Sequence, residues 1–445
     1  MTLFKKLRFL SRLTKAFLSK WYILIFLGIF LGIVTYFFIP KIVKNLPLPL
    51  KVVKIGILGK YTIQEVPDEI LKKLSRGLTK ELDNGTVLPD VSSSWQISPD
   101  GQVYTFNFKD KVFWNDGSEF KPDDVNYNFK EAKILPIDFQ TLKIKLDENF
   151  APFLSVVSQP LFKKGLIGLG DYKVDKIERS GQILKSILLV PVKKNDTNPK
   201  ILYRFYVNID YLKTAFKLGE VDIIENLDSN NQFIEWKNIS YSQAQNDLQH
   251  LVLFFNTKKD PFFDKNFRQA ISYGIGKETG KKRSFGPLSH TSWAFNPGIK
   301  KYDIDLDKAK LLLSKIKLKP DAVFSINTFL NLESEANKIK KQLTALGIKS
   351  EVKLTPYSPE DFDMLLAIVQ IPKDPDQYLL WHTTSQQSNI SHFSNPRIDK
   401  LLEEGRKTQN HEERKKIYFD FQRFLVEESP AVFLSYPSYY RLERK

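Results

Sequence analysis

Hydrophobic and polar positions divide the chain into an apolar N-terminal run and a long body of mixed pattern. Residues 21–39, WYILIFLGIFLGIVTYFFI, carry no charged side chain and predict one apolar helix. From residue 52 onward, runs in which apolar and polar residues alternate predict strands, and runs with apolar residues three or four apart predict helices. Strands and helices follow one another along the second half, so the body is predicted to be α/β, with a sheet covered by helices.

Two tight turns lie close together in the first half of this body. The runs 95–97 and 103–108 flank Pro99-Asp100-Gly101, which predicts a β-hairpin because Pro presets φ and Gly accepts a positive φ. Asp116-Gly117 predicts a second turn directly afterwards. These turns are scaffold signals and carry no chemistry of their own.

The same reading gives the remaining elements. Strands are expected at 51–58, 349–354 and 431–434, and helices at 65–78, from Pro122, at 305–318, at 333–346, at 396–405 and at 410–429. Asn395 and Asn410 are the expected N-caps of the last two helices, and Gly405 is the expected stop of the first of these.

The N-terminal apolar run is predicted to be a membrane anchor. Its length matches a hydrocarbon core of roughly 30 Å, and Lys or Arg residues precede it, which favours a cytoplasmic segment 1–20, an anchor 21–40 and an extracytoplasmic body. A cleaved signal peptide is the alternative, although no small-x-small cleavage site follows the run. Residues 41–50, with Pro47-Leu48-Pro49, are expected to form a spacer.

Charge does not indicate a nucleic-acid partner. The net charge is +16, but residues 1–60 hold eleven Lys or Arg and no acid, which leaves 16 − 11 = +5 for the other 385 residues. A small excess spread over a body rich in both signs is typical of solvated surface. We therefore expect no nucleic-acid binding.

No catalytic or metal-binding motif stands out. The chain has no cysteine, which excludes disulfides, thiolate metal sites and a lipidated N-terminal Cys, and its five histidines form no metal-binding spacing. Adjacent acids such as Asp123-Asp124 sit in predicted helix turns, where solvated charge explains them. Neither an enzyme nor a cofactor is expected.

Several blocks together resemble one family, the extracellular solute-binding proteins of family 5, which contains the dipeptide- and oligopeptide-binding proteins of ABC importers. The signature-like block runs from 92 to 130 and includes SSSWQISPDGQVYTFNF, and Gly219-Glu220-Val221-Asp222-Ile223 resembles the family's "GEVDI" element. Further similar blocks follow in family order at 74–79, 83–90, 255–273, 302–312, 346–348, 374–376, 395–399 and 428–431.

The resemblance implies a periplasmic-binding-protein-like fold with two α/β lobes that close on a solute and deliver it to a membrane permease. Lobe I is expected at 51–250 plus 430–445 and lobe II at 251–429, and the short stretch 130–141 implies a trimmed extra subdomain. A monomer on the outer side of the cell membrane is expected, held by residues 21–39 and partnered by ABC permease subunits. A surface scaffold or sensor that keeps the fold without transport is the alternative.

Candidate ligand-facing residues follow from the family's pocket segments, not from spacing. Phe254 and Phe255 are placed at the expected crossing between the lobes. The full set is Gln64, Glu225, Asn226, Phe254, Phe255, Gln370, Trp381 and Asn389.

The segment before Asp374-Pro375 departs from the peptide-binding members. Ile368 stands where they carry a Trp, and Ile371 stands where an Asp pairs with the peptide's amino group. An isoleucine cannot neutralise an ammonium group, and burying that charge unpaired is costly. We therefore expect weak binding of simple dipeptides and tripeptides, unless Glu225 supplies the carboxylate from the other lobe.

Overall fold

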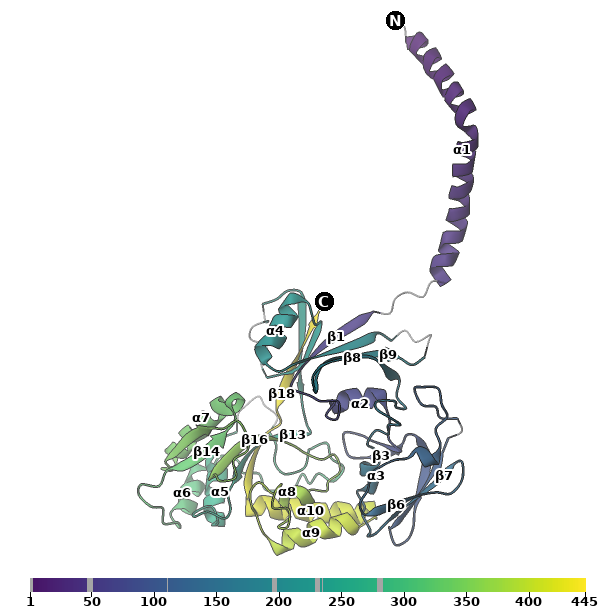
Figure 1. Ribbon diagram of the computed structural model, residues 1–445. Coiled ribbons are helices and arrows are strands. Elements are labelled where there is room, and N and C mark those ends of the chain that lie inside the picture. The colour runs from purple at the N-terminus through teal and green to yellow at the C-terminus, as the bar shows by residue number, and fades with distance from the viewer. Residues whose placement is uncertain are drawn as a thin grey trace. The chain divides into compact units, whose positions relative to one another are not determined.

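The computed structural model describes residues 3–45, 51–109, 111–193, 198–228, 233, 235–277 and 283–445. The chain forms two compact units, Met1–Lys51 and Val52–Lys445, and each is described here by itself (Figure 1).

The first unit is the helix α1, Leu3–Asn45. Within the described residues, no single straight helix is both long and apolar enough to cross a membrane. Two segments of α1, Lys6–Leu24 and Phe26–Phe38, are bent by 51° relative to each other, and together they are long and apolar enough. Helix α1 continues through Asn45, so residues 41–45 of the expected spacer are helical, and its residues 46–50 lie outside the described residues.

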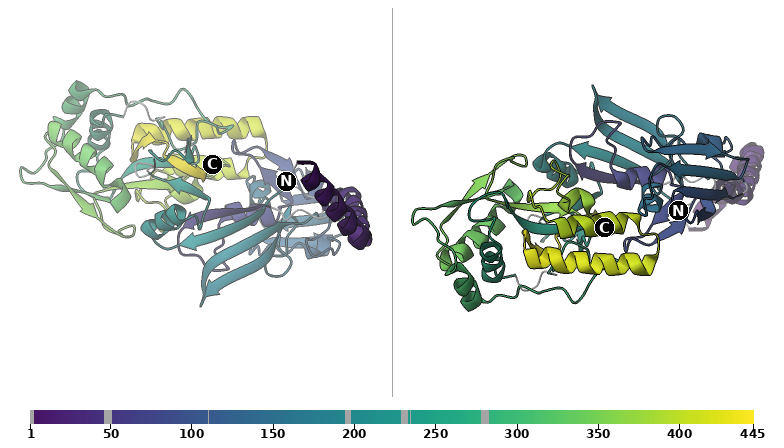
Figure 2. Two further views of the ribbon diagram at one scale, coloured as in Figure 1. Left: turned by 90° about the horizontal axis from the view of Figure 1, so that it is seen from above. Right: turned by 90° about the horizontal axis from the view of Figure 1, so that it is seen from below.

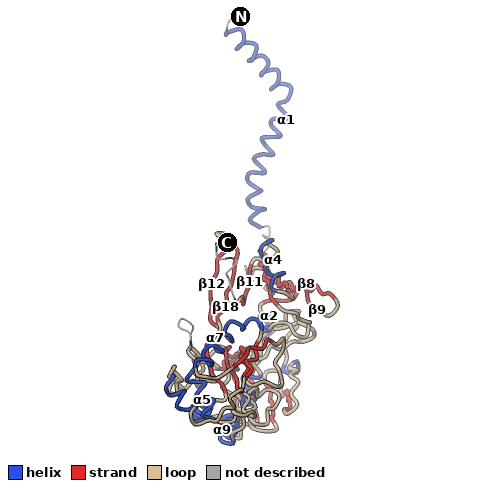
Figure 3. The backbone as a smooth tube through the Cα atoms, turned by 90° about the vertical axis from the view of Figure 1, so that its left-hand side faces the viewer, coloured by secondary structure: helices blue, strands red, loops and turns tan. Residues whose placement is uncertain are grey.

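A seven-stranded mixed sheet forms the core of the first lobe. Its strand order is β12–β18–β11–β1–β10–β9–β8, and β1 runs parallel to β10 and β11. Figure 3 shows β12, β18 and β11 side by side near the C-terminus. The strands are β1 (Val52–Leu58), β8 (Tyr172–Ser180), β9 (Ile183–Pro191), β10 (Lys200–Tyr206), β11 (Ile223–Leu227), β12 (Ile239–Gln245) and β18 (Ser438–Arg444).

Both faces of this sheet are covered, which is why β1 reads as an apolar run. Helix α2 (Asp68–Leu74) packs Ile70 and Leu74 against one face, and α4 (Ile209–Leu218) packs Leu212 and Phe216 against the other. Gly56 of β1 lies close to α4, because a Cβ there would sit 2.4 Å from Leu212 Cδ1.

A four-stranded antiparallel sheet, β4–β5–β7–β6, forms the subdomain of the first lobe. Both turn predictions are confirmed: β4 and β5 pair across Gly101 (φ +70°), and Gly117 (φ +88°) donates its N–H to Trp114. The helix expected from Pro122 is only the 3₁₀ turn η1. The elements are β2 (Thr79–Glu81), β3 (Val87–Pro89), β4 (Ser92–Ile97), β5 (Val103–Phe108), η1 (Pro122–Asp124), β6 (Ala132–Pro136), β7 (Thr141–Leu146) and α3 (Phe153–Val156).

The second lobe is built on the five-stranded sheet β15–β14–β16–β13–β17. Figure 2 shows α9 and α10 (yellow) running side by side in this lobe. Its elements are β13 (Gln249–Phe255), α5 (Lys265–Gly274), α6 (Leu306–Leu313), β14 (Phe324–Thr328), η2 (Leu330–Leu332), α7 (Glu333–Ala345), β15 (Ser350–Leu354), β16 (Met364–Gln370), α8 (Tyr378–Trp381), α9 (Pro396–Lys407), α10 (His411–Glu428) and β17 (Ala431–Ser435).

The predicted N-caps of the last two helices are confirmed, whereas the predicted C-terminal end of α9 is wrong. Asn395 accepts hydrogen bonds from the N–H groups of Arg397 and Ile398, and Asn410 accepts one from Glu413 N–H. Helix α9 does not end at Gly405: it continues to Lys407, and Gly405 instead gives room to the Tyr418 ring of α10, whose Cζ would lie 2.7 Å from a Cβ there.

Candidate functional site

The chain passes between the two sheets twice, and the two passages lie together. Residues 246–248 lead from β12 to β13, and residues 436–437 lead from β17 back to β18. Asn246 N–H donates to Pro437 O at 2.9 Å, and Tyr439 O–H donates to Gln249 Oε1 at 2.6 Å. The paired passages form the hinge region.

The chain enters the second lobe earlier than expected, and it returns to the first lobe later than expected. Phe254 and Phe255 lie inside β13, so the chain has already entered the second sheet before them. At the other end, β17 pairs with β13 and stays in the second lobe, so the return to the first sheet begins at Ser438 and not at residue 430.

A cavity of about 530 Å³ lies beside this hinge, between the lobes. This volume falls in the range of small-molecule sites. We call it the hinge cavity; it is lined by Glu69, Asp83, Glu225, Asn226, Ala244, Gln245, Asn246, Asp247, Leu248, Thr291, Tyr439, Tyr440 and Arg441.

A β-bulge places two of these residues. The pairing of β11 with β18 shifts register between Ile224 and Leu227, and Asn226 within the shift has φ +58°. Asparagine tolerates the left-handed region better than most residues, and bulges re-aim side chains near binding sites. Both Glu225 and Asn226 line the cavity as a result.

Three of the four carboxylates in the hinge cavity have partners. Asp83 accepts a hydrogen bond from Lys373 Nζ of the second lobe at 2.7 Å, and this contact lowers the pKa of Asp83. Glu225 pairs with Arg441. Asp247 accepts from the Gln245 amide and lies 3.7 Å from His290 Nε2.

The fourth carboxylate, Glu69, differs from the others. It is half-buried in the first turn of α2, and it has no hydrogen-bond or ion-pair partner within the described part of the chain. Burial, followed by the negative charge of Glu225, raises the pKa of Glu69, while Lys73 on the next turn offsets only part of this.

Close contacts between the lobes adjoin the hinge cavity. The turn between β2 and β3 reaches the second lobe: Trp293 N–H donates to Asn84 O at 3.0 Å, and Lys373 Nζ approaches Glu81 O at 3.4 Å. Gly85 fits this contact because its φ is +82° and a Cβ there would lie 2.3 Å from Lys373 O.

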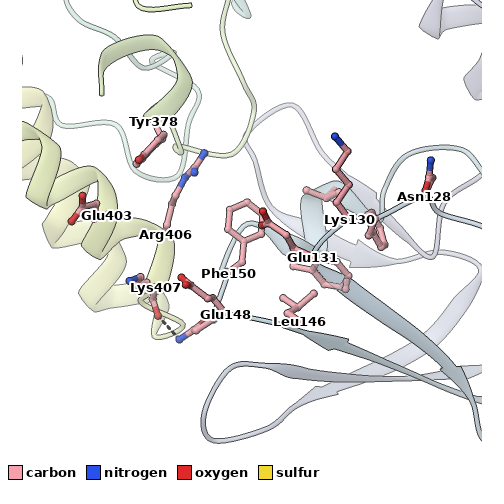
Figure 4. Close-up of a pocket in the computed structure, with 15 residues that line it drawn as sticks. Asn128, Lys130, Glu131, Leu146, Glu148, Phe150, Tyr378, Glu403, Arg406 and Lys407 are labelled. Carbon is pink, nitrogen blue, oxygen red and sulfur yellow. Dashed lines mark hydrogen bonds between the residues drawn. The ribbon is translucent and has the colours of Figure 1, made fainter. Parts of the chain in front are cut away.

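A second cavity, of about 650 Å³, lies between the subdomain of the first lobe and helices α8 and α9 of the second (Figure 4). We call it the distal cavity. Arg406 lines it, with its guanidinium carbon 3.9 Å from the Tyr378 ring centre and its Nε 2.9 Å from Asp376. Figure 4 shows Lys407 facing Glu148 and Phe150.

Four hydrogen bonds join the lobes at the edge of the distal cavity. Asn149 Nδ2 donates to Lys407 O at 2.6 Å, and Ala151 N–H donates to Arg406 O at 2.6 Å. Gln409 Nε2 donates to Asn149 Oδ1 and to Tyr104 Oη, both at 2.8 Å. These residues, 149–151 with Tyr104 and 406–409, form what we call the clasp.

Of the candidate ligand residues, only Glu225 and Asn226 line the hinge cavity. Phe254 and Trp381 line a small apolar pocket inside the second lobe, and Ile371 lines the same pocket. Ile371 is 3% exposed, and its N–H donates to Leu248 O at 2.7 Å. The position that the resemblance matches to an amine-pairing Asp is therefore buried and apolar in this chain.

The other four candidates lie elsewhere. Phe255 is fully buried in the core of the second lobe, and the Asn389 amide holds the chain locally by donating to Phe393 O at 2.8 Å. Gln64 is exposed before α2, and Gln370 is exposed at the end of β16, opposite Gln249. Packing explains the Phe255 and Asn389 side chains without a ligand.

Residues that sequence reasoning missed include Glu69, Asp247 and Arg441. Glu69 lies on the polar side of the short helix α2, and Arg441 lies in β18, where polar residues alternate with apolar ones. Neither position can therefore be recognised as a binding residue from its neighbours in the sequence. The described residues contain no group of three or more His, Cys, Asp or Glu that could hold a metal ion.

Comparisons with known proteins agree with this fold. The model of the bacterial extracellular solute-binding proteins, family 5, matches residues 86–138 and 131–390, which together span 305 of the 445 residues. The Escherichia coli periplasmic murein peptide-binding protein is 23% identical over 81% of this chain and 82% of its own length. A probable D,D-dipeptide-binding periplasmic protein of the same species is 24% identical over 79% of each.

Solved structures show the same fold. A Campylobacter jejuni protein in complex with Ni(L-His) superposes with a TM-score of 0.75 and 24% identity, covering 89% of this chain and 95% of that one. A substrate-binding protein of a Listeria monocytogenes ABC transporter gives a TM-score of 0.77 at 20% identity, covering 89% and 94%. The two-lobed fold and the family match together show that this chain belongs to the bacterial extracellular solute-binding proteins of family 5, whose members bind substrates and are not enzymes.

Proposed function

We propose that this chain is the membrane-anchored, extracytoplasmic solute-binding component of an ABC importer, which captures a peptide-like or related small solute between its lobes and delivers it to the permease. The hinge cavity carries the proposal, because both lobes contribute to a space of solute size at the point where they pivot. Capturing and delivering a solute requires no catalytic residues.

Native mass spectrometry of the full chain, purified from its host in detergent, tests capture. We expect a small solute bound at one copy per chain that is released on denaturation. The proposal would be contradicted if the purified protein carried no solute and if no peptide from a broad set raised its melting temperature.

The names of the relatives support a peptide-like solute. They include a murein peptide-binding protein, a D,D-dipeptide-binding protein and di/tripeptide-binding proteins, although one relative is named for heme and another for glutathione. With Ile371 in place of the amine-pairing Asp, a simple peptide that relied on that position loses a charge-assisted hydrogen bond of about 1.5–3 kcal/mol, roughly tenfold to over a hundredfold in affinity.

Membrane attachment through residues 21–39 is part of the proposal. The support is the uncharged run, the preceding basic residues and the bent helix pair that passes the length and composition test together. After alkaline extraction of host membranes, the chain is expected in the membrane pellet with its N-terminus intact. A mature protein that begins after residue 40 would refute the anchor.

Delivery requires ABC permease subunits as partners, and a monomer suffices because one chain supplies both lobes. Cross-linking in host membranes, followed by mass spectrometry, is expected to recover the permease with one copy of this chain per transporter.

A further inference from the structure

One edge of the seven-stranded sheet brings together segments that are far apart in the sequence. Val52 of β1 lies beside Lys200 of β10, and the other register pairs place the starts of β8, β11 and β12 and the ends of β9 and β18 at the same edge. The end of α4 joins them, because Lys54 Nζ donates to Gly219 O at 3.5 Å. We call this the basic edge; it consists of residues 51–54, 171–173, 191–193, 198–200, 217–222, 235–239 and 443–445.

The basic edge carries an excess of positive charge. It holds nine Lys or Arg residues and five Asp or Glu residues, so its net charge is 9 − 5 = +4. Three of the five acids already have partners: Glu220 and Glu443 pair with arginines outside the edge, and Asp222 accepts a hydrogen bond from Lys54 N–H at 3.1 Å. These acids are therefore not available to neutralise the lysines.

Five lysines of the basic edge form no ion pair within the described part of the chain, and all but one of them are exposed. They come from the ends of five different strands. Because neighbouring strands lie about 4.8 Å apart, they form a row about 30 Å long across the sheet. The five are Lys51, Lys173, Lys193, Lys200 and Lys237.

The opposite edge of the same sheet has the opposite charge. The other ends of β11, β12 and β18 lead to the hinge cavity, whose ionisable side chains are four carboxylates and one guanidinium. Solubility requires net charge but not this segregation, whereas a lobe with charges of opposite sign at its two ends is oriented by a charged surface.

We propose that the basic edge docks on the anionic headgroups of the membrane that holds the chain. The inference goes beyond solute capture and rests on the proposed anchor, residues 21–39. Strand β1 begins seven residues after α1 ends, and seven residues span at most about 25 Å. An anchored chain therefore keeps the start of β1 within reach of the lipid headgroups, which attract exposed lysines when they are anionic.

Docking would involve the first lobe alone, since every segment of the basic edge belongs to it. The lobes can then close on a solute without leaving the lipid. The hinge cavity lies at the far end of strands such as β1, whose seven residues rise about 3.3 Å each, so it stays about 20 Å from the docked edge.

The chain has no cysteine, so one introduced cysteine carries a single dye. The full chain is reconstituted in nanodiscs of phosphatidylcholine, alone or mixed with phosphatidylglycerol, with an energy-transfer acceptor on the headgroups. Asn238→Cys places the donor at the basic edge, and Gln182→Cys places it in the exposed turn between β8 and β9, at the opposite edge. We expect phosphatidylglycerol to raise energy transfer from position 238 and not from position 182. High salt should cancel the rise, because it screens exposed charges.

A charge-removal variant tests the lysines themselves. Each lysine near an anionic surface shifts the ratio of docked to undocked chains about fivefold, so the loss of three should lower it roughly a hundredfold. The variant combines Lys173→Gln, Lys193→Gln and Lys200→Gln. The matched control removes the same charge from β6 and β7 of the subdomain and should keep the lipid-dependent rise; it combines Lys133→Gln, Lys143→Gln and Lys145→Gln.

Equal transfer on the two kinds of disc, or a rise that survives loss of the three basic-edge lysines, would overturn the inference and leave the anchor and solute capture standing. Discs that take up no chain would overturn the anchor and this inference together, while solute binding in detergent still tests capture.

Discussion

The pair Arg414–Asp374 is expected to be the strongest single electrostatic contact in the second lobe. Arg414 of α10 donates to both oxygens of Asp374, at 2.8 and 2.6 Å, and its Nε donates to Gly405 O at 2.8 Å. The two side chains are only 7% and 11% exposed. Burial alone lowers the pKa of Arg414, but the Asp374 carboxylate outweighs this and raises it.

Asp374→Asn removes the charge and keeps the shape. An asparagine still accepts from Asp376 N–H, which Asp374 Oδ1 does at 2.9 Å, so the local turn survives. The buried guanidinium then lacks its counter-charge, which costs about 3–5 kcal/mol in comparable pairs. Because one hydrogen bond to Arg414 remains available, we expect about 3 kcal/mol.

The matched control is Asp376→Asn, two residues away in the same turn. Asp376 pairs with Arg406, whose side chain is 25% exposed, so water replaces part of the lost interaction. We expect a cost of about 1 kcal/mol or less.

Urea unfolding of the full chain in detergent, followed by tryptophan fluorescence, measures both costs. A double-mutant cycle with Arg414→Gln isolates the interaction between the two side chains. In this cycle, Asp374→Asn should destabilise the Arg414→Gln variant clearly less than it destabilises the wild type. A cost for Asp374→Asn below about 1 kcal/mol, or no larger than that of Asp376→Asn, would refute the reasoning.

Three further outcomes are expected. Burial lowers the pKa of His250 to about 3, so the unfolded chain takes up a proton below its ordinary 6.5 that the folded chain refuses; stability should therefore fall by about 1.4 kcal/mol per pH unit near pH 5, and His250→Phe should flatten this slope in denaturant titrations. Burial, followed by the negative charge of Glu225, raises the pKa of Glu69, so the contribution of this side chain to folding is present below about pH 4.5 and is lost as pH rises; Glu69→Gln should remove this pH dependence in thermal melting assays, and an unchanged dependence would contradict the reasoning. Asn149→Ala with Gln409→Ala should weaken the clasp by about 2 kcal/mol and shift the lobes toward the open state about 30-fold, measured by fluorescence energy transfer between dyes on the two lobes; an unchanged distance distribution would contradict this.

The sequence by itself determined the local elements that have a local cause. Gly101 and Gly117 adopt the positive φ that their turns require, and Asn395 and Asn410 cap their helices, because each of these contacts spans only a few residues. The order of sequence blocks also identified the family, and with it the two-lobed fold.

Contacts between distant segments decided the rest. Gly405 does not end its helix, and Tyr418 packs against it; Phe255 is buried in the core because β13 lies between β16 and β17 in its sheet. The partners in the hinge cavity are separated by long stretches of chain: Glu225 meets Arg441, and Glu69 faces Glu225 across a bulge. Burial and charge pairing depend on which segments the fold brings together, so periodicity along the chain cannot reveal that Glu69 is the carboxylate left without a partner in the described structure.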